Sequence, residues 1–269
     1  SMTQDTSVLF SGMADQLVED YLESKNPQRR GIPIPIYHVY NSIGSFELSQ
    51  VTTVVAKSSV GKTFLLQKCA DAAIHGDPFR FYQPPNEPLW TPEQKDEAAV
   101  KTILCSFEMS AIDIARRQSA LMSKISFNRI RSGKLEQDEE KSYMDFLRCL
   151  ASGGDSESTK IGSRLRILGP ESVSTPMQID AQADDFGADM VILDGFYLMD
   201  GPGDKRWEAV QENMKQIRLN SLRSNRHYLL ASQLDTKSST KSASNLDNLS
   251  FSASIVHDSN NIIFMTQTA

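Results

Sequence analysis

Short apolar runs alternate with longer amphipathic stretches along most of this 269-residue chain. Runs of four or five residues rich in Val, Ile and Leu predict buried strands, whereas apolar positions spaced three and four apart predict helices. We expect strands over residues 51–55, 103–107, 165–168, 190–193, 228–231 and 262–265, and helices over residues 62–74, 110–124, 136–150, 176–186 and 207–224. This alternation predicts an α/β fold with a mostly parallel twisted sheet flanked by helices.

An amphipathic stretch precedes the alternating region. Its apolar residues are spaced to form one face of a short helix: Phe10, Met13, Leu17, Val18, Tyr21 and Leu22. The polar and proline-containing segments at residues 26–31 and 33–35 then predict a linker. The chain is therefore expected to have an N-terminal helix and arm over residues 1–30 and one domain over residues 31–269. The pattern leaves open a helix that packs on its own domain.

A turn of small residues joins the first predicted strand to the first long helix. Its residues are Ala56, Lys57, Ser58, Ser59, Val60, Gly61, Lys62 and Thr63. In a strand, turn and helix of this kind, backbone N–H groups and the helix N-terminus face phosphate groups. Lys62 would contact the β- and γ-phosphates, and the Thr63 hydroxyl would ligate Mg²⁺. The turn therefore predicts a nucleotide site, with a plain surface turn as the alternative.

Three further strand ends carry polar side chains. Glu108 follows the second predicted strand, and Ser110 with Asp113 predicts the N-cap of the next helix. A carboxylate at Glu108 could take a proton from a water that attacks the γ-phosphate. Asp194 ends another strand and suits the metal-side carboxylate, while the amide of Gln233 could sense a γ-phosphate. In parallel sheets ligands bind at these carboxyl ends, so we expect the stretches to converge on a nucleotide and Mg²⁺.

In this order the four stretches resemble the motor domain of the DnaB-type replicative DNA helicases, which have a RecA-like P-loop core. The resemblance runs from about residue 31 to residue 268 and rests most on Glu-Met-Ser after a strand, at residues 108–110. Alanine at the position of Ala56 is frequent in that family. Further echoes are Arg117, Ile130-Arg131-Ser132-Gly133-Lys134-Leu135, and Ser252-Ala253-Ser254-Ile255 with Asp258.

The resemblance implies an ATP-dependent helicase that translocates on single-stranded DNA as a ring, expected to be a hexamer. By the same resemblance, Lys62 and Thr63 bind ATP and Mg²⁺, Glu108 is the catalytic base, Asp194 is the metal-side acid and Gln233 couples hydrolysis to movement. Primase or a helicase loader are the protein partners that it implies. The N-terminal helix would dock on the next subunit of the ring.

Departures from the family pattern qualify this picture. Asp194-Gly195-Phe196-Tyr197-Leu198 replaces the usual Asp-Tyr-Leu-Gln-Leu, and Val256-His257-Asp258 replaces Glu-Gln-Asp. Residues 77–99 are longer than the family connection and rich in proline, so we expect an inserted loop. The sequence ends before the last strands of the family, which carry basic finger residues that complete a neighbouring site. Ser1 before Met2 is typical of a cloning scar, so we expect either an expressed fragment or a shortened gene product. Without the finger residues, its activity is expected to be weak.

Composition limits the partners of this protein. The net charge of −6 gives no overall basic footprint for nucleic acid. The local candidates for contacts with single-stranded DNA are Lys205, Arg206, Lys237 and Lys241. On composition alone, the Ser- and Lys-rich stretch over residues 235–250 is better described as a solvated loop, and only the helicase resemblance makes it a candidate for gripping DNA.

Compartment and class follow from what the sequence contains. No secretory signal or bilayer-spanning apolar run is evident, and Cys69, Cys105 and Cys149 lack metal-like spacing. We therefore expect a cytoplasmic protein of a bacterial or phage-infected cell, with reduced thiols and no membrane contact. Two alternatives stay open: a recombinase-like or clock-type ATPase with the same core, and a nucleotide-binding interaction module without turnover. Glu108 argues against the second, since an inactive site has no need of a base.

Overall fold

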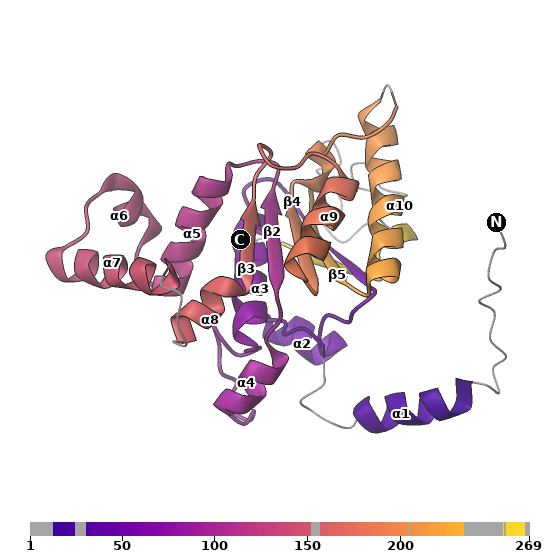
Figure 1. Cartoon of the computed structure of the whole chain (residues 1–269), viewed down its shortest axis with the longest axis horizontal. Coiled ribbons are helices and arrows are strands. Elements are labelled where there is room, and N and C mark those ends of the chain that lie inside the picture. The colour runs from indigo at the N-terminus through magenta and orange to yellow at the C-terminus, as the bar shows by residue number, and fades with distance from the viewer. Residues whose placement is uncertain are drawn as a thin grey trace.

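A six-stranded sheet forms the centre of the computed structural model, which describes residues 13–24, 31–151, 157–203, 205–233, 255 and 257–266 (Figure 1). The strands are β1 (Val51–Ala56), β2 (Thr102–Ser106), β3 (Leu165–Leu168), β4 (Met190–Asp194), β5 (His227–Gln233) and β6 (Asn261–Met265). They lie in the order β3-β2-β4-β5-β1-β6, and all five neighbouring pairs are parallel. The predicted α/β fold class is confirmed, and each predicted strand matches an observed one to within two residues.

Ten helices and a short 3₁₀ turn surround the sheet within the described ranges. They are α1 (Ala14–Ser24), α2 (Tyr37–Ile43), α3 (Lys62–His75), α4 (Pro92–Ala98), α5 (Ala111–Ser123), α6 (Phe127–Ser132), α7 (Gln137–Ala151), α8 (Glu157–Ser163), α9 (Pro176–Phe186), η3 (Phe196–Leu198) and α10 (Arg206–Ser224). The five long helices predicted after residue 60 are α3, α5, α7, α9 and α10. None of the described helices is both long and apolar enough to cross a membrane.

Two hydrophobic cores lie on opposite faces of the sheet. Neighbouring residues of one strand serve different cores: Val55 packs with α9 and α10, whereas Val54 packs with α3 and α5. β1, β2 and β4 are buried along their whole length. This explains why the strands appear in the sequence as continuous apolar runs, since a parallel sheet is covered by helices on both faces. The sheet, packed between the two cores, supports the loops at the carboxyl ends of the strands.

The expected inserted loop over residues 77–99 is only partly a loop. Its last third is α4, which begins at Pro92 after a reciprocal cap between Thr91 and Gln94. Aromatic contacts fix the rest of the segment, because Phe79 packs edge-on against Tyr40 at 5.4 Å. The prediction of a loop was therefore wrong for residues 92–98: proline at the first helical position starts a helix as readily as it punctuates a loop.

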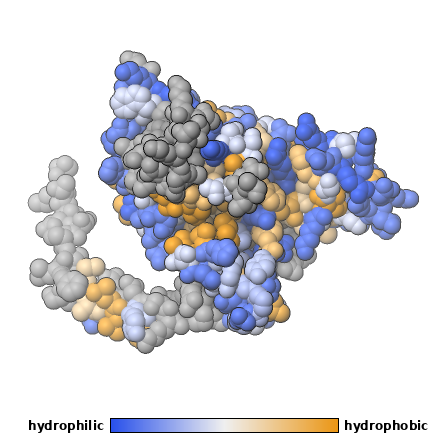
Figure 2. Space-filling model, turned by 180° about the vertical axis from the view of Figure 1, so that it is seen from behind, coloured by the Kyte–Doolittle hydropathy of each residue, from blue (hydrophilic) through white to orange (hydrophobic). Residues whose placement is uncertain are grey.

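α1 is present as an amphipathic helix whose apolar residues face solvent. Its exposed side chains include Leu17, Val18 and Leu22, and Figure 2 shows apolar atoms at its surface. Figure 1 shows the helix away from the sheet and its flanking helices. In the described part of the chain, α1 therefore does not bury its apolar face on its own domain.

The three cysteines differ sharply in exposure. Cys69 on α3 and Cys105 on β2 are buried, whereas Cys149 on α7 is exposed. Burial raises the pKa of both buried thiols to about 12, so they stay protonated at neutral pH. No three His, Cys, Asp or Glu side chains of the described ranges gather as a metal site.

A buried ion-pair network joins α9 to the start of β5. The guanidinium of Arg226 donates to Asp180 at 3.1 Å, to Asp184 at 2.5 Å and to the Ala188 carbonyl at 2.7 Å. Asp180 also accepts hydrogen bonds from Arg223 and, at 3.1 Å, from the Tyr228 hydroxyl. Each buried polar atom of this network thus has a partner, which is the condition for tolerating charge in a core.

His227 lies beside that network and should make stability depend on pH. Its ring stacks on Phe46 and its Nδ1 lies 2.7 Å from the Glu47 carbonyl oxygen, while Nε2 has no partner among the described residues. Burial lowers its pKa from 6.5 to about 4. Between these two pH values the imidazole is therefore protonated in the unfolded chain but neutral in the folded chain. The free energy of unfolding falls as the pH decreases through this range.

We expect acidification from pH 7 to pH 4 to lower the free energy of unfolding by about 3 kcal/mol through His227 alone. Urea denaturation at several pH values measures this loss. His227→Asn removes the titrating ring and should flatten the dependence, whereas His38→Asn, at an exposed histidine, should leave it unchanged. Equal pH slopes in wild type and His227→Asn would contradict the assignment.

Candidate nucleotide-binding site

Four neighbouring strands deliver the predicted site residues to one edge of the sheet. The order β2-β4-β5-β1 aligns their carboxyl ends, with Ser106 opposite Asp194 and Ala56 opposite Gln233. Glu108 lies in the turn just after β2. The structure therefore brings together the residues that the sequence assigned to one nucleotide site.

The turn between β1 and α3 has the backbone of an anion-binding loop. Ser59 and Gly61 have φ angles of +63° and +102°, whereas Ala56 has no positive φ. Among the described residues, no acceptor pairs with the N–H groups of residues 58–61. A side chain added at Gly61 would meet nothing within 4 Å. Open space, unpaired N–H groups and the N-terminus of a 14-residue helix suit a phosphate chain.

Lys62 is folded back onto this loop. Its Nζ donates to the carbonyl oxygens of Ala56 at 3.3 Å and Lys57 at 3.1 Å. Burial lowers its pKa, and the charges of Glu108 and Asp194 oppose that shift. Both carboxylates are thus near enough to the ammonium to affect it. The hydrogen bonds to neutral carbonyls are ones that a phosphate oxygen could replace.

Thr63 and Asp194 form the candidate Mg²⁺ ligands. The Thr63 hydroxyl donates to Asp194 Oδ2 at 2.7 Å, across the gap between α3 and β4. Asp194 is only 2% exposed, and this burial raises the pKa of its carboxyl group. The hydrogen bond from Thr63 lowers the same pKa. Paired hydroxyl and carboxylate oxygens are hard donors of the kind Mg²⁺ prefers. The residues present therefore fit this ion.

Glu108 is held at the site by its neighbours on β2. The Ser106 hydroxyl oxygen accepts hydrogen bonds from the N–H groups of Glu108 and Met109, each at 3.2 Å. Ser110 then caps α5 by accepting from the Asp113 N–H, as the sequence predicted. The carboxylate itself is exposed toward the open end of the sheet. It is thus anchored through its backbone while its side chain can reach a bound ligand.

Tyr197 is a site residue to which the sequence analysis gave no role. Its hydroxyl donates to Glu108 Oε1 at 2.5 Å and lies 3.4 Å from Gln233 Oε1. Burial and the Glu108 carboxylate raise the pKa of the phenol, and Arg206 opposes them. The signal in the sequence was the departure at residues 195–197, where an aromatic hydroxyl follows Asp194 by three positions.

The predicted DNA contacts are only partly described. Lys205 and Arg206 are exposed at the start of α10, and the charge of Arg206 is felt at Tyr197. These two cations therefore lie on the same side of the domain as the nucleotide site. Lys237 and Lys241 lie outside the described residues.

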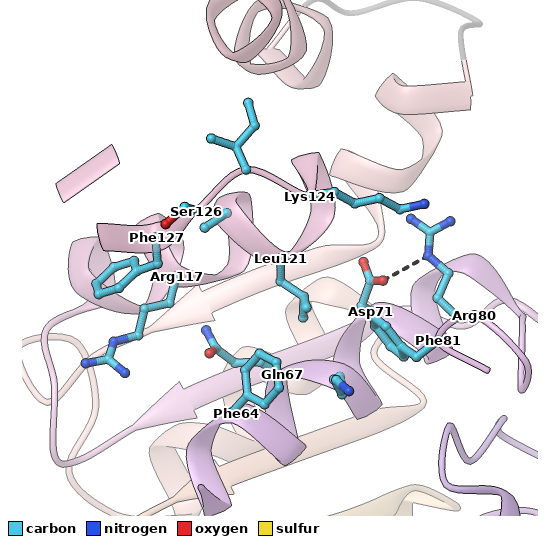
Figure 3. A pocket seen from close by; sticks show the side chains of 13 residues that line it. Phe64, Gln67, Asp71, Arg80, Phe81, Arg117, Leu121, Lys124, Ser126 and Phe127 are labelled. Carbon is cyan, nitrogen blue, oxygen red and sulfur yellow. Dashed lines mark hydrogen bonds and ion pairs between the residues drawn. The ribbon is translucent and has the colours of Figure 1, made fainter. Parts of the chain in front are cut away.

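A separate cavity of about 740 Å³ lies between α3, α5 and the start of α6 (Figure 3). Phe64, Phe81 and Phe127 line it together with cationic side chains, among them Lys68 and Arg117. Arg117 lies over the Phe127 ring, 4.9 Å from its centroid. The structure thus places Arg117, an echo of the family pattern, in this cavity and not among the residues of the nucleotide site.

Comparisons with known proteins agree with this geometry. Residues 31–269 match the family described as "DnaB-like helicase C terminal domain". A solved structure whose title describes it as an ATPase domain superposes with a TM-score of 0.73 at 15% identity, covering 98% of this chain and 84% of that one. Another, titled "The Structure Of A DnaB-Like Replicative Helicase And Its Interactions With Primase", gives a TM-score of 0.72 at 14% identity, covering 99% and 58%. No curated protein matches the sequence.

The two structural likenesses show the fold, and the chain spans a little over half of the second protein. The family match is the stronger evidence, because it covers most of the chain and includes all four motif stretches. The phosphate-binding turn over residues 56–63 and the hydrogen bond between Thr63 and Asp194 agree with this family match. The chain belongs to the family of DnaB-like helicase C-terminal domains.

Proposed function

We propose that this domain binds ATP with Mg²⁺ at the edge of the sheet and hydrolyses it to drive movement along single-stranded DNA. The observation that carries the proposal is the convergence of Lys62, the Thr63 and Asp194 pair, and Glu108 around one open anion-binding loop. A carboxylate beside a metal-ligand pair and a phosphate loop is the minimal equipment for phosphoryl transfer to water.

The residues divide the work as follows. The N–H groups of residues 58–61 and the Lys62 ammonium hold the phosphates, with Lys62 leaving its loop carbonyls to do so. Thr63 and Asp194 would hold Mg²⁺, and the ion would offset the negative charge of the phosphates. Glu108 takes the proton from the attacking water, since its carboxylate is exposed whereas that of Asp194 is buried. Gln233 contacts the γ-phosphate. It transmits the loss of this phosphate after hydrolysis to the segment that follows β5.

We also propose assembly into a ring, a hexamer by resemblance, in which α1 docks on the neighbouring subunit. Leu17, Val18 and Leu22 expose an apolar face on α1, and the Figure 3 cavity offers phenylalanine rings rimmed by cations. Asp15 and Glu19 on α1 are exposed and complement the cationic side chains of that cavity in charge. The ring would place each nucleotide at an interface between two subunits.

Single-stranded DNA is proposed to run through that ring past Lys205, Arg206, Lys237 and Lys241. The chain carries a net charge of −6, so one subunit holds a polyanion weakly and several linked subunits hold it better. Primase or a helicase loader are the proposed protein partners, and the cytoplasm of a bacterial or phage-infected cell is the proposed compartment. The solved helicase whose title names primase supports the first of these.

The test is oligonucleotide binding and DNA-stimulated hydrolysis at two salt concentrations. Wild type should bind labelled single-stranded DNA, lose affinity steeply with salt, and hydrolyse ATP faster when bound. Lys237→Ala with Lys241→Ala, and Lys205→Ala with Arg206→Ala, should each weaken binding. Lys141→Ala with Lys215→Ala removes the same charge elsewhere and should bind like wild type. Salt-independent binding would move the DNA contacts elsewhere, and Lys62-dependent binding of ATP without turnover would favour a nucleotide-switched interaction module.

A further inference from the structure

The turn that follows β4 is built to fix the direction of Tyr197. Gly195 has a φ of +71°, a left-handed angle at which a residue with a Cβ is strained. The N–H of Leu198 closes the turn on the Gly195 carbonyl at 2.8 Å, and Phe196 is fully buried in the core. Tyr197 lies within this closed turn and next to the buried Phe196, so its side chain has little freedom to point elsewhere.

The Tyr197 hydroxyl meets side chains from two other strand ends. It lies 2.5 Å from Glu108 Oε1 after β2 and 3.4 Å from the side-chain amide of Gln233 on β5. A phenol has one proton to donate, and the shorter contact with the carboxylate takes it. The phenol oxygen can then accept from the Gln233 amide, whose oxygen and nitrogen exchange places by a half-turn.

A second contact restricts the Glu108 side chain. A Cβ added to Gly195 would lie 2.8 Å from Glu108 Cγ, so the side chain of Glu108 rests directly on the bare backbone of the glycine. Glu108 is otherwise exposed and its long side chain would sample several rotamers in solvent. The glycine surface and the Tyr197 hydroxyl together leave it few.

We propose that Tyr197 is a positioning residue that orients Glu108 for catalysis and links it to Gln233. This inference rests on the proposed ATPase function. With Oε1 held by Tyr197, Oε2 is left to accept the proton of the attacking water, whose oxygen bonds to the γ-phosphorus as the bond to the ADP oxygen breaks. Tyr197 keeps its own proton throughout, in accord with the raised pKa of its phenol. Gln233 contacts the same phenol oxygen. When Gln233 moves to the γ-phosphate, it therefore changes how firmly Tyr197 holds Glu108.

The link has measurable consequences that a merely structural tyrosine would lack. Tyr197→Phe keeps the ring and removes only the hydroxyl. We expect kcat to fall by about tenfold, as for the loss of one hydrogen bond to a charged group. KM should stay within about twofold.

Matched variants separate positioning from folding. Tyr143→Phe also removes a hydroxyl that makes one hydrogen bond, to Ser119 at 2.7 Å, but on the α5 and α7 side of the domain. It should leave kcat unchanged. Gln233→Leu combined with Tyr197→Phe should cost less than the product of the single effects, since both changes break one linked contact.

Binding of ADP with aluminium fluoride, a mimic of the transferring phosphoryl group, gives a readout that needs no turnover. Tyr197→Phe should weaken binding of the mimic by about tenfold and leave ADP affinity unchanged. Wild-type kcat and wild-type mimic affinity in Tyr197→Phe would overturn the inference while leaving the ATPase assignment intact. Failure of wild type to bind ATP through Lys62 would instead remove the proposed function, and the inference with it.

Discussion

Replacing Glu108 by Gln should abolish measurable ATP turnover while ATP binding stays within about twofold of wild type. The amide has the shape of the carboxylate but cannot accept the proton of the attacking water, and a general base contributes about 10² to 10⁴ in rate. The baseline is itself expected to be slow. A basic finger supplied in trans by a neighbouring subunit contributes about 10³ to 10⁵ in related reactions, so an isolated subunit should turn over slowly. Single-turnover hydrolysis and calorimetry on the same protein measure the two effects.

Lys62→Ala provides the opposite phenotype and so completes this test. Deleting the ammonium removes a charged contact with the phosphates, and ATP affinity should fall by at least about tenfold. Lys57→Ala, at an exposed lysine of the same loop, is the matched control and should bind ATP nearly as well as wild type. Robust turnover in Glu108→Gln would show that another group acts as the base. Fast turnover by a wild-type monomer would show that the site is complete within one chain.

Asp180→Ala should lower the free energy of unfolding by about 3 kcal/mol. This is the largest stability loss that we expect from one substitution at a buried position. The substitution leaves the buried Arg226 guanidinium with fewer partners and the Tyr228 hydroxyl without its acceptor. The remaining bonds of Arg226 to Asp184 and Ala188 keep the loss from being larger. Urea denaturation gives the value directly.

A neighbouring acid supplies the control for Asp180. Asp185 accepts from Arg166 at 2.8 Å but is mostly exposed, so Asp185→Ala should cost less than about 1 kcal/mol. If the two substitutions cost the same, burial of the network is not what gives Asp180 its effect. Loss of ATP binding in Asp180→Ala at temperatures where it stays folded would also contradict a purely structural role.

Much of the fold was predictable because its central strands are buried on both faces. Runs such as residues 190–193 are apolar throughout, and a polar residue marks the point where the strand ends. The parallel arrangement then brings Glu108, Asp194 and the phosphate loop together without any knowledge of side-chain contacts. Their placement at one edge needed only the rule that parallel strands share their carboxyl ends.

What the sequence could not predict depends on short-range geometry or on long-range pairing. α4 was missed because Pro92 starts a helix only in combination with the Thr91 and Gln94 cap. The role of Tyr197 depends on the left-handed turn at Gly195, which no periodicity reveals. The ion pairs of Asp180 join residues more than forty positions apart, and their burial follows from how α9 packs on β5.

The uneven burial of the three cysteines provides a ready-made spectroscopic handle. Thiol-reactive dyes attack the thiolate, so Cys69 and Cys105, enclosed and with pKa values near 12, should react very slowly in the folded protein. Cys149 on α7 is accessible. Unaltered protein should therefore take up one fluorophore per chain. Photobleaching steps in single particles would then count how many chains gather around ATP or DNA, with no engineered mutation in the sample.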